Sequence, residues 1–244
     1  MQSTILIVAG FFAGFVDAIV GGGGLITLPT LLTLGIPPLT ALGTNKALGV
    51  STALASSGKY IRSGNVRWNQ LKWMIPLCLM TSMSGAFVAT QIDASILSKA
   101  LPLVLMLIFI FLLLKKDFGT MEKEKIPGVW GIIFIPAISF YDGLIGPGTG
   151  SFLCLAFISI YGYALLNASA NSRIINLTSN IGAIVLFSYH GVIDLQMAWP
   201  ACISSFIGGY LGAKYAISIG SKKIRPFFIL SIAALLLKLL WNQY

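Results

Sequence analysis

The sequence predicts an all-α fold, a polytopic bundle of transmembrane helices that consists of two repeats and contains Gly-rich breaks. Hydrophobic residues make up 57% of the chain and charged residues only 9%, whereas about a quarter of the residues in a soluble domain are charged. Apolar stretches close to the roughly 20 residues that span a bilayer core recur along the whole chain. A duplicated order of motifs indicates the two repeats.

Motifs of the first part of the chain return in the second part in the same order. The matching positions are 17–24 with 142–149, 44–46 with 171–173, Gly64 with Gly191, and Pro76 with Pro200. Transporter folds are often built from two related halves. We therefore divide the chain into a first transmembrane repeat (1–114), a polar cytoplasmic linker (115–127) and a second transmembrane repeat (128–244).

Each repeat is predicted to contain an apolar helix, a Gly-rich break, a short apolar helix and three further helices. The first repeat has them at Ser3–Val20, Leu25–Leu34, Thr44–Ser57, Leu71–Thr90 and Ile96–Leu114. The second repeat has them at Val129–Ile145, Ser151–Tyr161, Ser169–Tyr189, Gln196–Ala213 and Ile224–Trp241.

The basic residues predict the orientation of the repeats. Three loops hold four Lys or Arg residues each, at 59–72, 115–125 and 214–225, whereas only Lys99 and Lys238 fall on the other side. Cytoplasmic loops are enriched in Lys and Arg. This pattern favours inverted repeats, in which each first helix pair runs out and back at a re-entrant break. Parallel repeats with a continuous broken span are the alternative. Since the charge of +9 lies in these loops, nucleic acid is not an expected partner.

Two glycine-rich breaks interrupt the apolar pattern, at 21–24 and 146–150. Non-helical backbone at membrane depth is tolerated only where it is buried in protein or lines a polar cavity. The helix that follows each break would present free amides and a partial positive charge, which suit an anion. Close helix packing is the alternative role for small residues. The candidate anion-binding residues here are Gly22, Gly23, Gly24, Gly148, Thr149 and Gly150.

Lys46 and Arg173 are matched cations, each placed in an otherwise apolar segment. A charge in a membrane segment is costly and therefore indicates function, although long basic side chains also extend toward the headgroups. Neighbouring hydroxyl and amide groups suit an oxyanion, so the substrate-binding set also includes Thr44, Asn45, Asn171 and Ser172. Asn176, Ser179 and Asn180 are weaker candidates for the same cavity.

Asp17 and Asp142 each precede a break by about one helical turn. Three roles remain open for them: pairing with Lys46 or Arg173, capping the amides of the break, or carrying a proton for coupled transport. The sequence contains no recognisable catalytic grouping and no metal or cofactor motif. We therefore expect neither enzymatic activity, nor a metal ion, nor a cofactor.

These motifs together resemble the sulfite exporter TauE/SafE family of bacterial membrane permeases, over nearly the whole chain. The resemblance rests on residues 14–26, Pro29, Gly35, Ala41, Thr44-Asn45-Lys46, residues 146–150 and Asn171-Ser172-Arg173. It implies a multi-pass secondary transporter in the bacterial inner membrane. The implied substrates are small anions such as sulfite, sulfoacetate or other organosulfonates.

The expected function is alternating-access transport of a small anion held between the two breaks. Lys46 and Arg173 would neutralise its charge, and a proton on Asp17 or Asp142 would provide coupling. Two alternatives remain: an anion channel, and a non-transporting membrane subunit that binds partner helices. A homodimer is compatible with the sequence.

Overall fold

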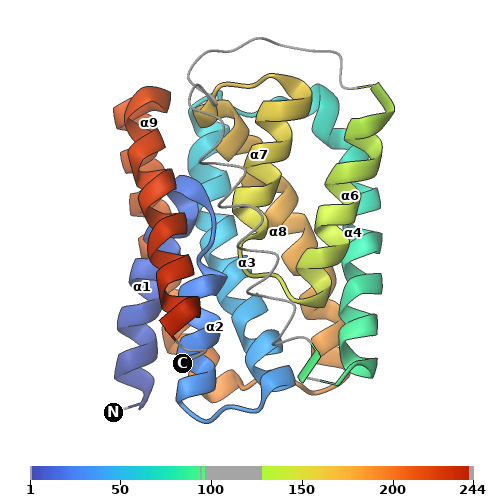
Figure 1. Cartoon of the computed structure of the whole chain (residues 1–244), viewed down its shortest axis with the longest axis vertical. Helices are drawn as coiled ribbons and strands as arrows, with labels where there is room; N and C mark the ends of the chain where they lie inside the picture. Colours follow the sequence, from blue (N-terminus) through green and yellow to red (C-terminus); the bar gives the residue numbers. More distant parts are fainter. Residues whose placement is uncertain (1, 94, 97–127, 242–244) are drawn as a thin grey trace.

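The computed structural model describes residues 2–93, 95–96 and 128–241. The described residues form helices and no strand, which confirms the predicted all-α class (Figure 1). The helices are α1 (Gln2–Val20), α2 (Gly24–Thr33), α3 (Pro38–Arg62), α4 (Trp68–Gln91), α6 (Gly128–Leu144), α7 (Thr149–Tyr161), α8 (Leu165–Tyr189) and α9 (Leu195–Trp241). The predicted linker, and the predicted helix Ile96–Leu114 except for its first residue, lie outside the described residues.

Helices α3 and α8 begin earlier than predicted, so the predicted starts at Thr44 and Ser169 were wrong. Helix α3 starts at Pro38, and proline is favoured at the first helical position because its fixed φ suits the helix and its missing N–H costs nothing there. Helix α8 starts at Leu165. As a consequence, the two cationic positions lie inside long helices and not at their first turns.

The two predicted breaks are present, and the chain reverses direction at each of them (Figure 1). The backbone reversal uses positive φ angles of 86° at Gly21, 103° at Gly22, 92° at Gly146 and 83° at Gly148. Residues with a Cβ atom rarely adopt these angles, so the glycines allow the turns. In Figure 1, α1 and α2 form a hairpin that enters from one end of the bundle, and α6 and α7 form a hairpin that enters from the other.

A third change of direction lies inside α9. Gly220 has non-helical angles of φ 70° and ψ 173°, so α9 consists of two helices joined at this residue. Its first part extends beyond the predicted end at Ala213. Helix α9 packs along α1, and α4 packs along α6. These contacts bring early and late parts of the sequence together on both sides of the bundle (Figure 1).

Polarity is distributed as expected for a protein surrounded by lipid. Large apolar side chains are exposed on the outer helices, for example Phe12 on α1, Met80 on α4 and Ile203 on α9. Polar and charged side chains are buried between α3 and α8. Exposed apolar belts of this extent are unusual in soluble monomers. The arrangement therefore places an apolar face outward and a polar centre inside.

Two of the described helices are long and apolar enough to cross a membrane by themselves. They contain the segments Ser3–Val20 and Trp68–Gln91, with mean hydropathy values of 2.1 and 1.4. Helices α3 and α8 have 25 residues each, which at 1.5 Å per residue is about 37 Å, longer than a bilayer core of about 30 Å. Their lower apolar content reflects the polar side chains that they direct into the bundle.

Candidate functional site

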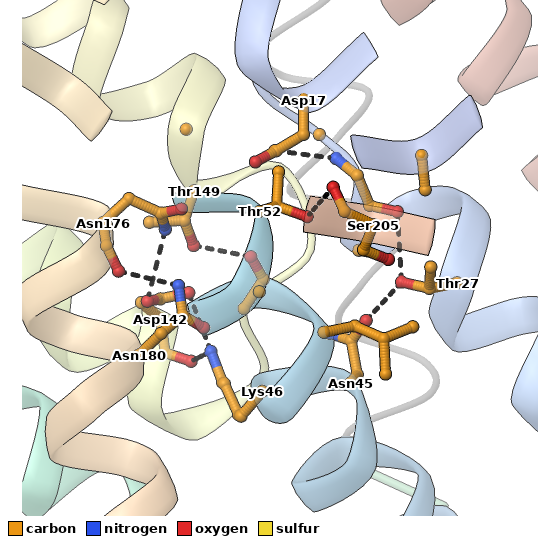
Figure 2. A pocket seen from close by; sticks show the side chains of 18 of the residues that line it. Asp17, Thr27, Asn45, Lys46, Thr52, Asp142, Thr149, Asn176, Asn180 and Ser205 are labelled. Carbon is orange, nitrogen blue, oxygen red and sulfur yellow. Dashed lines mark hydrogen bonds and ion pairs between the residues drawn. The ribbon is translucent and has the colours of Figure 1, made fainter. Parts of the chain in front are cut away.

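A small polar cavity lies at the centre of the bundle, where the two breaks meet (Figure 2). Its volume is about 40 Å³. The lining combines backbone of both breaks with side chains from α1, α2, α3, α6, α8 and α9. The lining residues that carry polar side chains are Asp17, Thr27, Asn45, Lys46, Thr52, Asp142, Thr149, Asn176, Asn180 and Ser205.

The two breaks touch each other directly beside this cavity. A Cβ atom on Gly21 would lie 2.8 Å from the Cα atom of Gly150 and closer still to the Ser151 amide. The Ser151 hydroxyl donates a hydrogen bond of 3.0 Å to the carbonyl of Val20. The absence of a side chain at Gly21 therefore allows one hairpin to rest on the other.

Glycine also makes room for the charged side chains. A Cβ atom on Gly150 would lie 2.9 Å from the guanidinium carbon of Arg173. A Cβ atom on Gly146 would overlap the ammonium group of Lys46. Because these two glycines have no side chain, the backbone of the second break can lie directly against the two cations.

Each cation forms an ion pair with a carboxylate from the other part of the chain. The Lys46 Nζ atom lies 2.8 Å from Asp142 Oδ1, and the Arg173 Nη1 atom lies 2.6 Å from Asp17 Oδ2. The sequence aligns position 17 with 142 and position 46 with 173. The two ion pairs are therefore equivalent contacts, in which the parts of the chain that supply the acid and the base are exchanged.

Burial makes both ion pairs structurally important. The side chains of Lys46 and Arg173 are each 1% exposed, that of Asp142 is 2% exposed and that of Asp17 is 11% exposed. Removing one partner of a buried pair typically costs about 3–5 kcal/mol, because the remaining charge stays in a low-dielectric environment. Neither cation reaches the surface of the bundle.

The carboxylates also accept hydrogen bonds from neutral groups. Asp17 Oδ1 accepts a bond of 2.9 Å from the amide of Gly23, which precedes α2. Asp142 Oδ2 accepts a hydrogen bond from the Ser179 hydroxyl and a long contact of 3.5 Å from the Asn176 amide group. Lys46 also donates to the Asp142 backbone carbonyl. Asp17 thus combines pairing with capping, and Asp142 combines pairing with side-chain hydrogen bonds.

Eight of the predicted anion-binding residues line the cavity: Gly22, Gly23, Gly24, Asn45, Lys46, Gly148, Thr149 and Gly150. Gly24 is the first residue of α2, and Thr149 and Gly150 are the first two residues of α7. The first amides of a helix have no partner within that helix. Figure 2 shows Lys46 directed toward Asp142, and Asn45 directed toward Thr27, whose hydroxyl donates to it.

The other four predicted residues are buried but do not line the cavity: Thr44, Asn171, Ser172 and Arg173. The Thr44 hydroxyl accepts a hydrogen bond of 3.0 Å from the Asp194 amide at the start of α9. Asn171 Oδ1 accepts one of 2.9 Å from the Arg67 amide at the start of α4. Ser172 donates to the Ser169 carbonyl at 2.8 Å. Their direct role in anion binding stays a prediction.

Three polar lining residues were not predicted: Thr27, Thr52 and Ser205. Thr52 and Gly49 lie seven and four residues after Asn45 on one face of α3, so this face could have been found from Asn45. The same spacing relates Asn176 and Asn180 on α8. Thr52 donates to the Ser205 carbonyl at 3.4 Å. Nothing in the sequence around Ser205 distinguishes it from the neighbouring small residues of α9.

Comparisons with known proteins agree with this architecture. Residues 6–239 match the family model described as "Sulfite exporter TauE/SafE". A probable membrane transporter protein from Sinorhizobium sp. is 38% identical over 240 residues, covering 96% of this chain and 91% of that protein. A probable membrane transporter protein from Haemophilus influenzae is 34% identical, covering 98% and 94%. YfcA of Escherichia coli, with the same description, is 32% identical, covering 98% and 90%.

No solved structure matches this chain significantly. The family match extends over nearly the whole sequence, and it includes both breaks and both ion pairs. The similar proteins are described as membrane transporters, which supports a membrane location for this chain as well. The chain belongs to the sulfite exporter TauE/SafE family.

Proposed function

We propose that this protein is a secondary transporter that carries a small oxyanion across the bacterial inner membrane by alternating access. The observation that carries the proposal is the central cavity, in which two helix breaks and a buried lysine converge. Helix N-termini and unwound backbone at the bilayer midplane form the substrate sites of several transporter folds. The description of the family supports sulfite as the first substrate to test.

The size of the cavity favours a compact substrate. A space of about 15 Å³ on the same measure holds one water molecule, so the volume of about 40 Å³ accommodates a few heavy atoms. Sulfite consists of one sulfur and three oxygen atoms, whereas sulfoacetate is roughly twice as large. We therefore place sulfite ahead of sulfoacetate and other organosulfonates, which would require the cavity to expand.

The lining supplies donors for all three oxygen atoms of such an anion. Lys46 provides a charged donor, and Gly24 and Gly150, at the starts of α2 and α7, provide backbone amides. Asn45 and Asn176 add side-chain amide groups. Hydrogen bonds to an ionised acceptor are roughly twice as strong as neutral ones, so these donors favour an anion over a neutral solute of the same size.

The transporter is proposed to consist of two inverted repeats, residues 1–114 and 128–244, joined by a cytoplasmic linker. Three reciprocal features support this: the hairpins of opposite direction (Figure 1), the exchanged ion pairs, and the exchanged helix caps from Thr44 and Asn171. The α3–α4 connection and the bend between the two parts of α9 lie at the same end of the bundle (Figure 1). Basic residues flank both, which supports a cytoplasmic position for this end.

This arrangement supports alternating access. One hairpin enters from each end of the bundle, and the two hairpins meet at their tips beside the cavity. A rocking movement of one repeat against the other would open the cavity first to one side and then to the other. The ion pair between Asp17 and Arg173 would tie the first hairpin to α8 while the substrate changes sides.

Purified protein in liposomes provides the test. Wild-type protein is expected to take up radiolabelled sulfite with saturation, and sulfoacetate more weakly. Lys46→Ala should reduce uptake at least tenfold, since a lost charged hydrogen bond is worth about 1.5–3 kcal/mol. Lys72→Ala is the matched control, because Lys72 is an exposed residue near the start of α4.

The same assay separates the alternatives. Flux that does not saturate and exceeds carrier turnover would identify an anion channel. Absence of flux in the wild type, together with a copurifying membrane partner, would identify a non-transporting subunit. Either result would contradict the proposed carrier.

A further inference from the structure

The cavity already contains as much negative as positive charge from the two ion pairs. Asp17, Lys46 and Asp142 line it, and Arg173 lies behind Asp17 as its partner. With both pairs ionised, these four side chains have no net charge. A bound anion would then add an uncompensated charge inside the membrane, which is unfavourable. The anion therefore needs one of the carboxylates to lose its charge.

The pair of Asp17 and Arg173 is poorly suited to that change. Arginine stays protonated in proteins, and Asp17 also accepts a hydrogen bond from the amide of Gly23, a group that can only donate. Gly150 packs against the guanidinium group, so Arg173 has little room to change partners. This ion pair has the properties of a permanent link between α1 and α8.

The pair of Asp142 and Lys46 differs in its cation and in the neighbours of its carboxylate, although Gly146 packs against the ammonium group as Gly150 packs against Arg173. Both side chains line the cavity, so the flexible ammonium group can turn toward a ligand without leaving its site. The second carboxylate oxygen of Asp142 lies against the Ser179 hydroxyl and near the Asn176 amide. A hydroxyl can donate to a carboxylate or accept from a carboxylic acid, so Ser179 suits both protonation states of Asp142.

Few other charges surround Asp142. Among the described residues, α3 contributes Lys46, while Asp17 of α1 and Arg173 of α8 belong to the other ion pair. Tyr141 on the same helix donates its hydroxyl to the Pro147 carbonyl. On α4, which packs along α6, the thiol of Cys78 interacts with Ser139, nearly one turn before Asp142. Asp142 is thus the carboxylate at the cavity whose charge is balanced by a lysine alone.

We propose that protonation of Asp142 releases Lys46 to bind the anion, so that one proton is carried with each anion. The proton enters from solvent and is held on a carboxyl oxygen of Asp142, beside Ser179 and Asn176. The ammonium group of Lys46 then exchanges the carboxylate for the anion, and no covalent bond changes. Because this rests on the proposed transport function, transport of a singly charged anion would be electroneutral, while Asp17 and Arg173 stay paired throughout.

The first test measures binding to the wild-type protein in detergent. Titration of sulfite by calorimetry in two buffers of different ionisation enthalpy gives the number of protons taken up with the anion. That number should be close to one after correction for the protonation of sulfite itself. As the pH rises from 6 to 8, the affinity of the protein for the ionisation state of sulfite that it binds should fall by up to about tenfold per pH unit. Proton uptake near zero would overturn the proposal without any variant.

The second test uses liposomes with a trapped pH dye and an imposed anion gradient. Wild-type protein should move protons together with the anion. Asp142→Asn should retain anion exchange across the membrane but lose the coupled proton movement and the pH dependence of binding. The matched control is Asp93→Asn, a change at an exposed carboxylate after α4, which should behave like the wild type.

The outcomes distinguish this inference from the proposed function. Saturable anion flux in the wild type without proton movement would disprove the role of Asp142 and leave the transporter intact. Proton-coupled flux in Asp142→Asn equal to that of the wild type would also disprove it. If Asp142→Asn does not fold, the number of protons that the wild-type protein takes up with sulfite in the calorimetric titration still tests the proposal. Absence of any saturable flux in the wild type would reject the transport function itself.

Discussion

The contact between the two breaks can be tested at Gly21, because the chain offers a control with nearly the same backbone angle. Gly21 has φ 86° and packs against Gly150 and Ser151, whereas Gly35 has φ 80° and no neighbour within 4 Å of the position of a Cβ atom. An alanine at either position must adopt a left-handed conformation, at a cost of about 1–2 kcal/mol. The contact with the opposite hairpin is specific to Gly21.

The extra cost at Gly21 follows from the missing space. The Cβ atom would lie 2.8 Å from the Gly150 Cα atom, whereas favourable carbon contacts lie at about 3.5–4.0 Å. The neighbour is backbone and cannot rotate away, so overpacking of about 1–3 kcal/mol is expected beyond the conformational cost. For a chain of this length, 1 kcal/mol corresponds to a shift of about 2–4 °C in Tm.

The assay compares thermal unfolding of Gly21→Ala and Gly35→Ala in the same detergent, followed by sulfite flux in liposomes. Gly35→Ala should lower Tm by a few degrees and retain flux. Gly21→Ala should lower Tm by a further several degrees and lose most of the flux, because the hairpin tips no longer meet. Equal shifts of Tm and equal flux in the two variants would refute direct contact between the breaks.

Three further substitutions separate binding from structure. Thr44→Ala removes the acceptor of the Asp194 amide and should lower stability by about 1 kcal/mol, as a lost helix cap does; a changed KM for sulfite would instead return Thr44 to the binding set. Asn45→Ala removes a cavity amide and should raise KM up to about tenfold in flux assays; an unchanged KM would exclude Asn45 from the site. Arg173→Lys keeps the charge but loses the planar guanidinium group that binds Asp17, so it should lower Tm by several degrees. An unchanged Tm would show that a positive charge alone is sufficient to stabilise the pair with Asp17.

The positions of the breaks could be predicted from the sequence because their cause is local. A run such as Gly21–Gly24 is unfavourable in a helix and favourable where positive φ angles are needed. The starts of α3 and α8 were predicted too late, although Pro38 is a local signal for the first helical turn. The reason is that the buried polar residues after it lower the apolar periodicity on which the prediction relied.

The composition of the site depended on tertiary structure and could be predicted only in part. Sequence alignment of the two parts singled out Asp17, Lys46, Asp142 and Arg173 together. It could not decide which carboxylate pairs with which cation, because the partners lie far apart along the chain and meet through helix packing. Small polar residues such as Thr52 and Ser205 look like packing residues until the cavity is seen.

Location of the bound anion tests the central claim of a substrate site between the two breaks. Selenite is an analogue of sulfite with a strong anomalous signal, so its position in crystals of the protein can be determined by anomalous diffraction. The expected result is a selenium peak in the central cavity, with a selenite oxygen about 2.8 Å from Lys46 Nζ and others facing the first turns of α2 and α7. A peak only at the basic end of the bundle, with the cavity free of selenium, would contradict the proposed site.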